Sequence, residues 1–356
     1  MNKSRSDFRI AVIPGDGIGP EVLKEGIKVL KHIAQQLPDQ NFDFEYFPWG
    51  CAYYLEHGKM MEDDGMERLK AFDAIYLGAR GYPGVPDHIS LWDLLLKIRR
   101  EFDQYINIRP VKLLSGALCP LNGVSPGDIN MRVVRENSEG EYAGAGEWIN
   151  RGRADEVVLQ TGVFTRTGTE RVIRYAFELA QKEGKSLNSI SKGNALNYSM
   201  VFWDQVFGEV SRDYPDVQTS SYLVDAASMF FVMDPSRFEI VVASNLFGDI
   251  ITDLGAAIAG GMGLAAGANL NPERKFPSMF EPIHGLAPDI AGKNMANPLA
   301  AIWSVSQMLD FFGFEQWGQR IINAMEKLMV EKKYLTPDLG GTAGTDEIAD
   351  ALIMHL

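Results

Sequence analysis

The stretch IPGDGIGPEV, residues 13–22, joins the apolar run RIAVIP to a helical segment and is the starting point for the fold. Its glycines follow part of the dinucleotide-binding fingerprint, which needs glycine at relative positions one, three and six. Gly15 and Gly17 satisfy the first two positions, but Pro20 occupies the third. Proline suits the first turn of a helix and does not give the close packing of glycine. We therefore interpret the stretch as a tight strand-to-helix turn rather than as a phosphate loop.

The same alternation of strand and helix continues after this turn. PEVLKEGIKVLKHIAQQL has apolar residues at three- and four-residue steps and predicts a helix. FDFEYFPW and DAIYLGA read as strands, and SLWDLLLKIRREFDQ reads as a helix with Ser90 as its N-cap. This rhythm predicts an α/β fold with a largely parallel sheet.

The middle of the chain has a different pattern. The strands DINMRVVREN and EVVLQTGVFT flank the glycine-rich segment at residues 140–154, where a protruding loop or hairpin arm is expected. Such arms often make dimer contacts. A helix ending at Gly184 follows, and the last 60 residues read as mainly helical. Because no low-complexity linker is present, any two domains must be interleaved.

The composition is that of an ordinary globular protein. A chain of 356 residues with 46% hydrophobic content can form two domains or one large one. No apolar run approaches a membrane span and no signal segment is evident, so we expect a cytoplasmic protein. The net charge of −13 argues against nucleic acid or an anionic membrane as a partner. Cys51 and Cys119 lie far apart and read as buried, reduced thiols.

Two aspartates in SNLFGDIITDLG, residues 244–255, are candidate metal ligands. Asp249 and Asp253 are four residues apart and therefore lie on one face of the helix that this segment predicts. Two carboxylates in an apolar setting favour Mg²⁺ or Mn²⁺, although a solvated acidic face is an equal alternative. Asp225 is flanked by apolar residues in SYLVDAASMFFV and would serve as a third ligand or in a salt bridge.

Several cationic or phenolic side chains stand near the ends of strands and helices. Arg99 lies on the SLWDLLLKIRR helix, Arg109 ends YINIRP, and Arg135 closes MRVVREN. Three guanidinium groups can bind one or two carboxylates, whereas each alone is more often a structural ion pair. Lys192 could act as a base and Tyr142 as a proton donor, or both could be ordinary polar residues.

The segment EPIHGLAPDIAGKNMANP, residues 281–298, predicts a structured loop of the kind that carries function. His284 could stack on or hydrogen-bond an adenine. Asp289 could accept a pair of ribose hydroxyls.

Taken in chain order, four motifs resemble the β-decarboxylating dehydrogenases, which include isocitrate, isopropylmalate and tartrate/D-malate dehydrogenases. The motifs are IPGDGIGPEV, REN with GEY, SNLFGDIITDLG, and EPIHGLAPDIAGK with ANP. The resemblance covers nearly the whole chain and is strongest to the tartrate/D-malate dehydrogenases. In that family the first glycine-rich turn is not a Rossmann fingerprint. The dinucleotide lies against the 281–298 loop, with help from the chain near residues 72–80.

The resemblance implies an isocitrate/isopropylmalate dehydrogenase-like fold of two interleaved α/β domains, which is not a Rossmann fold. Residues 1–108 and 265–356 would form the large, cofactor-binding domain. Residues 109–264 would form the small domain with the arm and the dimer contact. The active site would be shared between the two subunits of a homodimer.

Roles for the candidate residues follow from the same resemblance. Substrate binding would involve Trp92, Leu95, Arg99, Arg109 and Arg135. The catalytic pair would be Tyr142 and, from the neighbouring subunit, Lys192. The metal ligands would be Asp249 and Asp253, with Asp225 from that neighbour. The NAD-binding residues would be His284, Gly285, Ala287, Pro288, Asp289, Ile290 and Asn297.

The implied reaction is the NAD- and Mg²⁺- or Mn²⁺-dependent oxidative decarboxylation of a small 2-hydroxy diacid, such as D-malate to pyruvate and CO₂. NAD is favoured because Asp289 would repel a 2′-phosphate, and NADP-dependent members tend to carry lysine and tyrosine in place of Asp289 and Ile290. Trp92 would fill the space that a bulky substituent needs, which favours D-malate or tartrate. The order among D-malate, L-tartrate and meso-tartrate, and a requirement for K⁺, are left open.

Three alternatives compete with this interpretation. An isopropylmalate dehydrogenase of leucine synthesis keeps the reaction class and changes the substrate. A non-catalytic regulatory subunit would have lost an arginine, the tyrosine or a metal aspartate, and all of these are present. A metal-dependent phosphate-ester enzyme would need a lysine-rich phosphate site, which the sequence does not contain.

Overall fold

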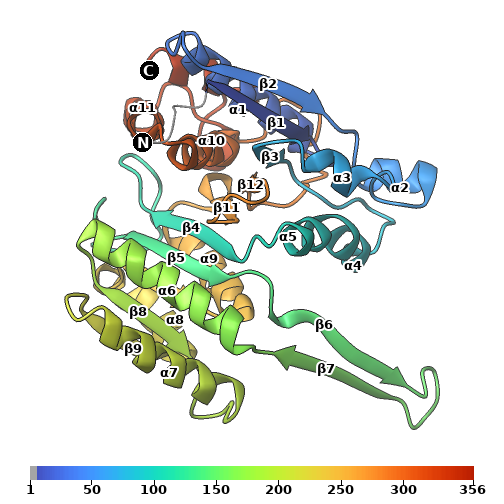
Figure 1. The fold of residues 1–356 in the computed structure, drawn as a ribbon. Coiled ribbons are helices and arrows are strands. Elements are labelled where there is room, and N and C mark those ends of the chain that lie inside the picture. Colours follow the sequence, from blue (N-terminus) through green and yellow to red (C-terminus); the bar gives the residue numbers. More distant parts are fainter. Residues whose placement is uncertain (1–5) are drawn as a thin grey trace. The chain divides into compact units, whose positions relative to one another are not determined.

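The structure, a computed structural model, describes residues 6–356 and forms two compact units (Figure 1). The first unit comprises the described residues up to Gln104 together with 112–126 and 256–356. The second unit comprises residues 105–111 and 127–255. The chain therefore enters each unit more than once.

The first unit has strands in the order β2-β1-β3-β12-β11. Their bounds are β1 (Asp7–Ile13), β2 (Asn41–Tyr46), β3 (Ala74–Leu77), β11 (Ala266–Leu270) and β12 (Ser278–Pro282). β1 pairs in parallel with β2 and β3, β12 pairs in parallel with β3, and β11 is antiparallel to β12. The predicted α/β fold with a largely parallel sheet is confirmed here.

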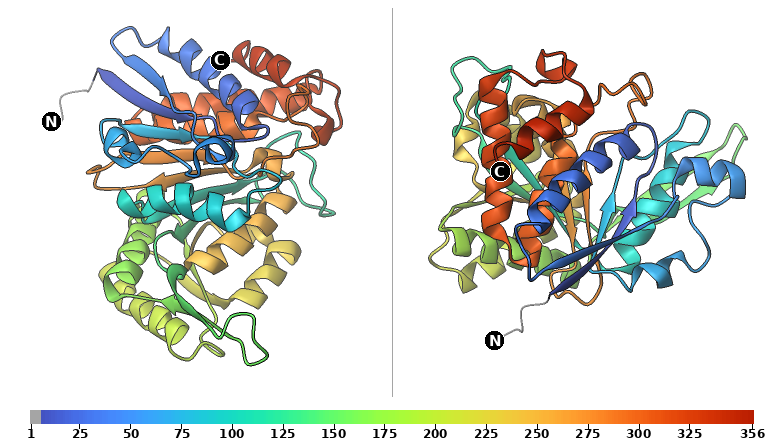
Figure 2. Two further views of the ribbon diagram at one scale, coloured as in Figure 1. Left: turned by 90° about the vertical axis from the view of Figure 1, so that its right-hand side faces the viewer. Right: turned by 90° about the horizontal axis from the view of Figure 1, so that it is seen from above.

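Helix α1 (Gly19–Ala34) follows the 13–22 turn, as predicted. It packs against α10 (Leu299–Phe312) and α12 (Thr345–Ile353), and Figure 2 shows this blue helix beside the red C-terminal ones. Val22, Ile27 and Leu30 form its buried face, which matches the predicted apolar periodicity. The remaining helical segments of this unit are α2 (Cys51–His57), α3 (Gly65–Leu69), α4 (Asp87–Ser90), η1 (Leu91–Leu96), α5 (Lys97–Glu101), η4 (Met262–Leu264), α11 (Glu315–Glu331) and η5 (Pro337–Leu339).

The glycines of the 13–22 turn are required by neighbouring backbone. Gly15 and Gly17 have φ angles of 70° and 57°, which glycine adopts without strain. A Cβ on Gly15 would lie 2.1 Å from the carbonyl oxygen of Ala79, and one on Gly17 would lie 2.1 Å from that of Leu286. The turn therefore packs directly against the loops that follow β3 and β12. This packing explains the glycines without a bound phosphate.

The helix predicted to start at Ser90 differs from the expectation. The helical stretch begins at Asp87, so Ser90 is not an N-cap, and its hydroxyl donates to the carbonyl oxygen of Asp87 at 3.1 Å. A π-helical turn then spans Leu91–Leu96 before α5. Such turns are rare and occur frequently at functional sites.

The second unit has strands in the order β4-β5-β10-β8-β9. Their bounds are β4 (Ile106–Lys112), β5 (Asn130–Glu136), β8 (Leu187–Ser191), β9 (Thr219–Leu223) and β10 (Ile240–Ala243). β10 is parallel to both β5 and β8, and β8 is parallel to β9. The helical segments are α6 (Arg166–Glu183), α7 (Ser199–Val210), η2 (Ser211–Asp213), α8 (Val224–Met233), η3 (Pro235–Arg237) and α9 (Asn245–Ile258).

A long hairpin extends from the second unit. β6 (Gly140–Ile149) and β7 (Val157–Val163) are antiparallel, with an irregular register between Gly140 and Ala145 (Figure 1). The hairpin arm predicted at 140–154 is therefore confirmed. The predicted helix end at Gly184 is confirmed too, because Gly184 caps α6 in the left-handed conformation.

Both cysteines are free, but they differ in exposure. Cys51 is buried, as predicted, and burial is the main reason why the pKa of its thiol is raised to about 12. Cys119 is only half-buried, which corrects the expectation that both are buried. Within residues 6–356, no helix has the length and apolar character needed to cross a membrane.

Candidate active site

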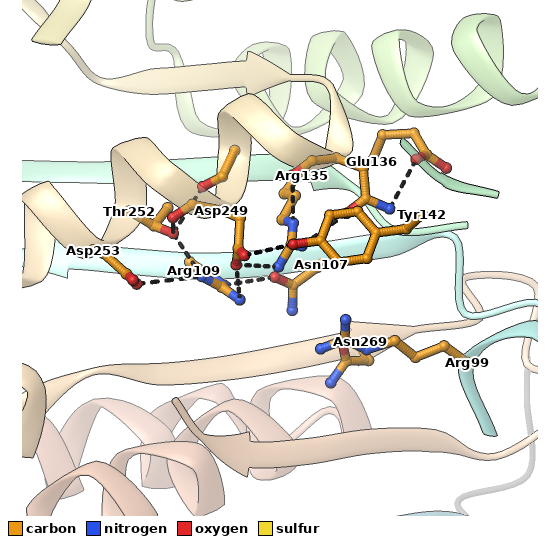
Figure 3. A network of polar contacts seen from close by, with 12 residues as sticks. Arg99, Asn107, Arg109, Arg135, Glu136, Tyr142, Asp249, Thr252, Asp253 and Asn269 are labelled. Carbon is orange, nitrogen blue, oxygen red and sulfur yellow. Dashed lines mark hydrogen bonds and ion pairs between the residues drawn. The ribbon is translucent and has the colours of Figure 1, made fainter. Parts of the chain in front are cut away.

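Asp249 is the centre of a charged cluster in the second unit (Figure 3). Its Oδ1 lies 2.7 Å from Nη1 of Arg135 and 3.0 Å from Nη2 of Arg109. Its Oδ2 accepts a hydrogen bond from the hydroxyl of Tyr142 at 3.1 Å. Both guanidinium groups are buried, so the carboxylate provides charge compensation that water cannot. The structure therefore brings together four of the predicted site residues of this unit, with Asp253 beside them.

The two arginines are held by further polar contacts. Arg109 donates from Nε to Asn107 Oδ1 at 2.8 Å and from Nη1 to Thr252 Oγ1 at 2.7 Å. Arg135 donates to Asn245 twice, at 2.8 Å to the carbonyl oxygen and at 2.7 Å to the side-chain oxygen. Both guanidinium planes are thereby fixed before any ligand binds.

Helix α9 lies very close to Arg135. A Cβ on Gly248 would stand 2.6 Å from Cγ of Arg135, so a glycine at this position allows the arginine stem to pass the helix. The sequence motif SNLFGDIITDLG thus contributes a glycine for packing as well as two aspartates.

Asp253 lies at the edge of the same cluster. Its Oδ1 is 3.9 Å from Nη1 of Arg109, which also contacts Asp249, so the prediction that both aspartates share one helix face is confirmed. The side chain of Asp253 is 61% exposed. Partial burial and the Asp249 carboxylate raise the pKa of Asp253, although Arg109 opposes the shift. A divalent cation at these carboxylates would relieve both unfavourable effects.

Lys192 and Asp225 form a separate pair in the second unit. The ammonium group of Lys192 is hydrogen-bonded to Oδ1 of Asp225, and this contact lowers the pKa of Asp225. Asp225 is mostly exposed rather than buried among apolar residues. Its salt-bridge partner, Lys192, directly follows β8. Among residues 6–356, no three His, Cys, Asp or Glu side chains are close enough to hold a metal ion. One chain thus offers two carboxylates to a cation at α9.

The first unit contains a buried ion pair that the sequence did not suggest. Nη2 of Arg99 lies 2.9 Å from Oε1 of Glu281, which also accepts from Asn269 at 2.8 Å. Arg80 stands 3.8 Å from the other oxygen. Burial raises the pKa of Glu281, but Arg99 and Arg80 outweigh it and hold that pKa below its ordinary value. Arg99 is therefore fixed by Glu281, which lies on the buried strand β12.

The two expected specificity residues have different surroundings. The ring of Trp92 is half-buried and lies 4.6 Å from the guanidinium carbon of Arg100. Leu95 is buried in the core of the first unit with Trp49 and Phe102. Their roles as substrate contacts stay predictions.

A cavity of ≈ 290 Å³ lies in the first unit beside the 281–298 loop. It is lined by Ile18, Gly263, His284, Ile290, Met295, Asn297, Pro337 and Asp338. Asn297 donates to Asp338 at 2.9 Å. The cavity thus combines apolar walls with a few fixed polar groups, as small-molecule sites do.

His284 has an unused polar atom in this region. Its Nδ1 is 3.1 Å from the carbonyl oxygen of Gly285, whereas Nε2 is buried with no hydrogen-bond partner among the described residues. Burial also lowers the pKa of the imidazole, which favours the neutral form. An unpaired buried nitrogen of this kind is suited to a hydrogen bond with a bound ligand.

Only some of the residues expected to bind NAD line this cavity. Three of them line the cavity, namely His284, Ile290 and Asn297. The four that do not line it are Gly285, Ala287, Pro288 and Asp289. Asp338 was not anticipated, although its loop, TPDLGGTAG, has the same proline- and glycine-rich composition that singled out residues 281–298.

The chain matches the family model described as isocitrate/isopropylmalate dehydrogenase over residues 9–352. It is 53% identical over 353 residues to the D-malate dehydrogenase [decarboxylating] of Escherichia coli (strain K12), covering 97% of each chain. It is 50% identical over 350 residues to a probable tartrate dehydrogenase/decarboxylase of Bacillus subtilis (strain 168), covering 98% of each.

A solved structure gives the same result for the fold. The crystal structure of isocitrate dehydrogenase from Methylococcus capsulatus superposes with a TM-score of 0.86 and 32% sequence identity, covering 98% of this chain and 99% of that one. The predicted fold class is thereby confirmed. The chain belongs to the isocitrate/isopropylmalate dehydrogenase family.

Proposed function

We propose that this protein is an NAD- and divalent-metal-dependent dehydrogenase that oxidatively decarboxylates a small 2-hydroxy diacid, D-malate and/or tartrate. One observation carries the proposal: a carboxylate on α9, two buried guanidinium groups and a tyrosine hydroxyl converge at Asp249. The relatives that are about 50% identical to this chain are named for D-malate and tartrate, which supports the same substrates here.

The charge of the cluster suits a dicarboxylate. Arg109 and Arg135 carry two positive charges, and Asp249 and Asp253 carry two negative ones, so the four side chains sum to zero. A divalent cation makes the sum +2, which matches the two carboxylates of malate or tartrate. We assign both arginines to substrate carboxylates, and Arg99 stays a predicted substrate-binding residue.

The carboxylates of Asp249 and Asp253 fit a hard cation, and we assign them as its ligands together with Asp225 of a second copy of this chain. Members of this family typically use NAD or NADP and a divalent metal. When bound, Mg²⁺ or Mn²⁺ supplies Lewis-acid polarisation at the C2 oxygen of the substrate.

Two side chains of this protein move protons in the proposed reaction. Lys192 would accept the proton of the C2 hydroxyl during oxidation at C2, and NAD, when bound, would supply the hydride acceptor. Tyr142 donates a proton to the carbon from which CO₂ departs. The hydroxyl of Tyr142 is held at Oδ2 of Asp249, which fixes its position.

Exposed apolar residues support a homodimer with shared active sites. Met229, Val232 and Met233 are exposed on α8, the helix of Asp225, and Ile250 is exposed beside Asp249 on α9. The arm adds Trp148, whose side chain is half exposed. Large apolar side chains gathered near candidate ligands indicate a covered surface, and a second copy of the chain is the occupant we propose.

We place NAD at the first unit, with its adenine in the cavity beside His284 and Asn297. The 1–108 and 265–356 region would be the cofactor-binding domain, and 109–264 the domain with the dimer contact. Gly285, Ala287 and Pro288 would shape the loop around the ribose, where Asp289 disfavours NADP. A cytoplasmic location agrees with two free cysteines.

The test is NADH absorbance with a panel of 2-hydroxy diacids, with and without Mn²⁺. We expect turnover of D-malate or a tartrate, loss of that turnover after metal removal, and little activity with 3-isopropylmalate. Replacing Trp92 with alanine should move the preference toward isopropylmalate. Equal or better turnover of isopropylmalate by the unmodified protein would overturn the assignment.

A further inference from the structure

Asp204, on α7, lies behind the turn that carries Lys192. β8 ends at Ser191 and Lys192 follows it directly. The hydroxyl of Ser191 lies near enough to the Asp204 carboxylate to lower the pKa of that carboxyl group. On the other side of the lysine, a Cβ added to Gly193 would lie 2.5 Å from Oδ2 of Asp204. One carboxylate thus lies close to both residues that flank Lys192.

The same part of α7 is anchored to β8 by a second contact. Nε1 of Trp203, a buried residue, donates to Oγ of Ser189 at 3.0 Å. The turn itself is closed by hydrogen bonds from the amides of Ala195 and Leu196 to the carbonyl oxygen of Lys192, at 3.0 and 2.9 Å. The backbone of Lys192 is therefore held from within the turn and from α7.

The partly buried carboxylate of Asp204 is unfavourable for the stability of the fold. Its Oδ1 is buried and has no hydrogen-bond partner among the described residues. Burial raises the pKa of this carboxyl group, although the Ser191 hydroxyl opposes the shift. A buried, unpaired oxygen in a folded protein calls for an explanation, and function is one.

We propose that Asp204 is a positioning residue that holds Lys192 in place for the oxidation step through its contacts with Ser191 and Gly193. The inference rests on the proposed role of Lys192 as the base. Lysine has a long, flexible side chain, so its reach depends on how firmly its backbone is fixed. A displacement of about 1 Å at a reacting group can lower the rate about 100-fold.

The experiment compares Asp204→Ala and Asp204→Asn with the unmodified protein. Asparagine keeps the size and an oxygen that can accept from Ser191, whereas alanine keeps neither. Gln205→Ala is the control, because Gln205 is exposed on the same helix and donates a hydrogen bond along that helix to Glu209. Each protein is assayed with NAD, Mn²⁺ and D-malate, and again with D-malate deuterated at C2.

For Asp204→Ala we expect kcat to fall about 100-fold while the KM values for D-malate and NAD change by less than about threefold. The deuterium isotope effect on kcat should rise, because a misplaced base slows the C2 oxidation. Asp204→Asn should recover most of kcat, and Gln205→Ala should match the unmodified protein.

An unchanged kcat for Asp204→Ala, or a fall in kcat without a larger isotope effect, overturns the proposal, since loss of folded protein alone does not alter the isotope effect. If that variant fails to fold, Ser191→Ala removes the same hydrogen bond from the other partner and must raise the isotope effect. If the unmodified protein does not oxidise D-malate or tartrate, the proposed function fails and this inference fails with it.

Discussion

Nη1 of Arg135 lies 2.7 Å from Oδ1 of Asp249, although one residue comes from β5 and the other from α9. This pair fixes the geometry of the cluster, because Asp249 also forms an ion pair with Arg109 and accepts a hydrogen bond from Tyr142. A carboxylate that compensates two buried guanidinium groups is structural in the free protein. In the proposed reaction the same carboxylate binds the metal.

Asp249→Asn tests both of these roles. Asparagine keeps the shape but removes the negative charge that lies 2.7 Å from Arg135 and 3.0 Å from Arg109, so we expect the free energy of unfolding to fall by about 1–3 kcal/mol. Mn²⁺ binding, followed by electron paramagnetic resonance, and turnover should both be lost. Asp310→Asn, on α10 of the first unit, serves as the control and should bind Mn²⁺ normally. Unaltered Mn²⁺ affinity in Asp249→Asn would remove this residue from the metal site.

Tyr142→Phe removes only a hydroxyl. Because that hydroxyl donates a hydrogen bond to Asp249 at 3.1 Å, its loss should cost the fold about 0.5–1.5 kcal/mol. Proton donation contributes on the order of 10²–10⁴-fold to such reactions, so kcat should fall by about that factor. Tyr46→Phe, at an exposed position of the first unit, is the control for a lost phenol. Retention of more than about half of kcat by Tyr142→Phe would contradict the assigned role.

Part of this cluster could be predicted from the sequence. The i and i+4 spacing of Asp249 and Asp253 fixes their common face once the segment is helical, and this depends only on helix geometry. The glycine cap at Gly184 and the 140–154 arm were likewise readable from local composition. Such features are encoded within a few residues of the chain.

Features that depend on distant partners were not predictable. Glu281 lies on the buried strand β12, and its partner Arg99 lies far away in sequence, so no local pattern marks the pair. The π-helical turn at Leu91–Leu96 could not be predicted, because its apolar residues fit the periodicity of an ordinary α-helix as well. Ser90 looked like an N-cap because it precedes that run, but helical structure begins three residues earlier at Asp87.

Asp289 and Ile290 provide a test of cofactor preference. We expect the unmodified protein to have a kcat/KM for NAD at least about tenfold above that for NADP, which is ~1.4 kcal/mol. The double substitution Asp289→Lys and Ile290→Tyr should reverse much of that preference, because lysine attracts the 2′-phosphate that aspartate repels. Initial rates with both cofactors at fixed D-malate measure the change. A higher kcat/KM for NADP in the unmodified protein would refute the cofactor assignment.

The Arg99–Glu281 pair predicts a dependence of stability on pH. The pKa of Glu281 is below its ordinary value of 4.5 in the folded protein, so its contribution to stability is present above that pH and is lost as the pH falls below it. Glu281→Gln leaves Arg99 buried without a charge partner and should cost about 3–5 kcal/mol at pH 7. Urea unfolding at pH 7 and at successively lower pH measures both proteins. We expect their difference to shrink below pH 4.5, and a difference that stays constant would contradict the shift.

The most direct test of the shared, metal-dependent site uses two inactive variants, Lys192→Ala and Asp249→Asn. Co-expressed with different tags and purified through both, they form a heterodimer in which one site has Lys192 from one chain and Asp249 from the other. If the active site is shared as proposed, each variant alone is inactive and the heterodimer oxidises D-malate with about half of the unmodified activity per dimer. A heterodimer no more active than either variant alone would show that the proposed residues do not combine across two chains.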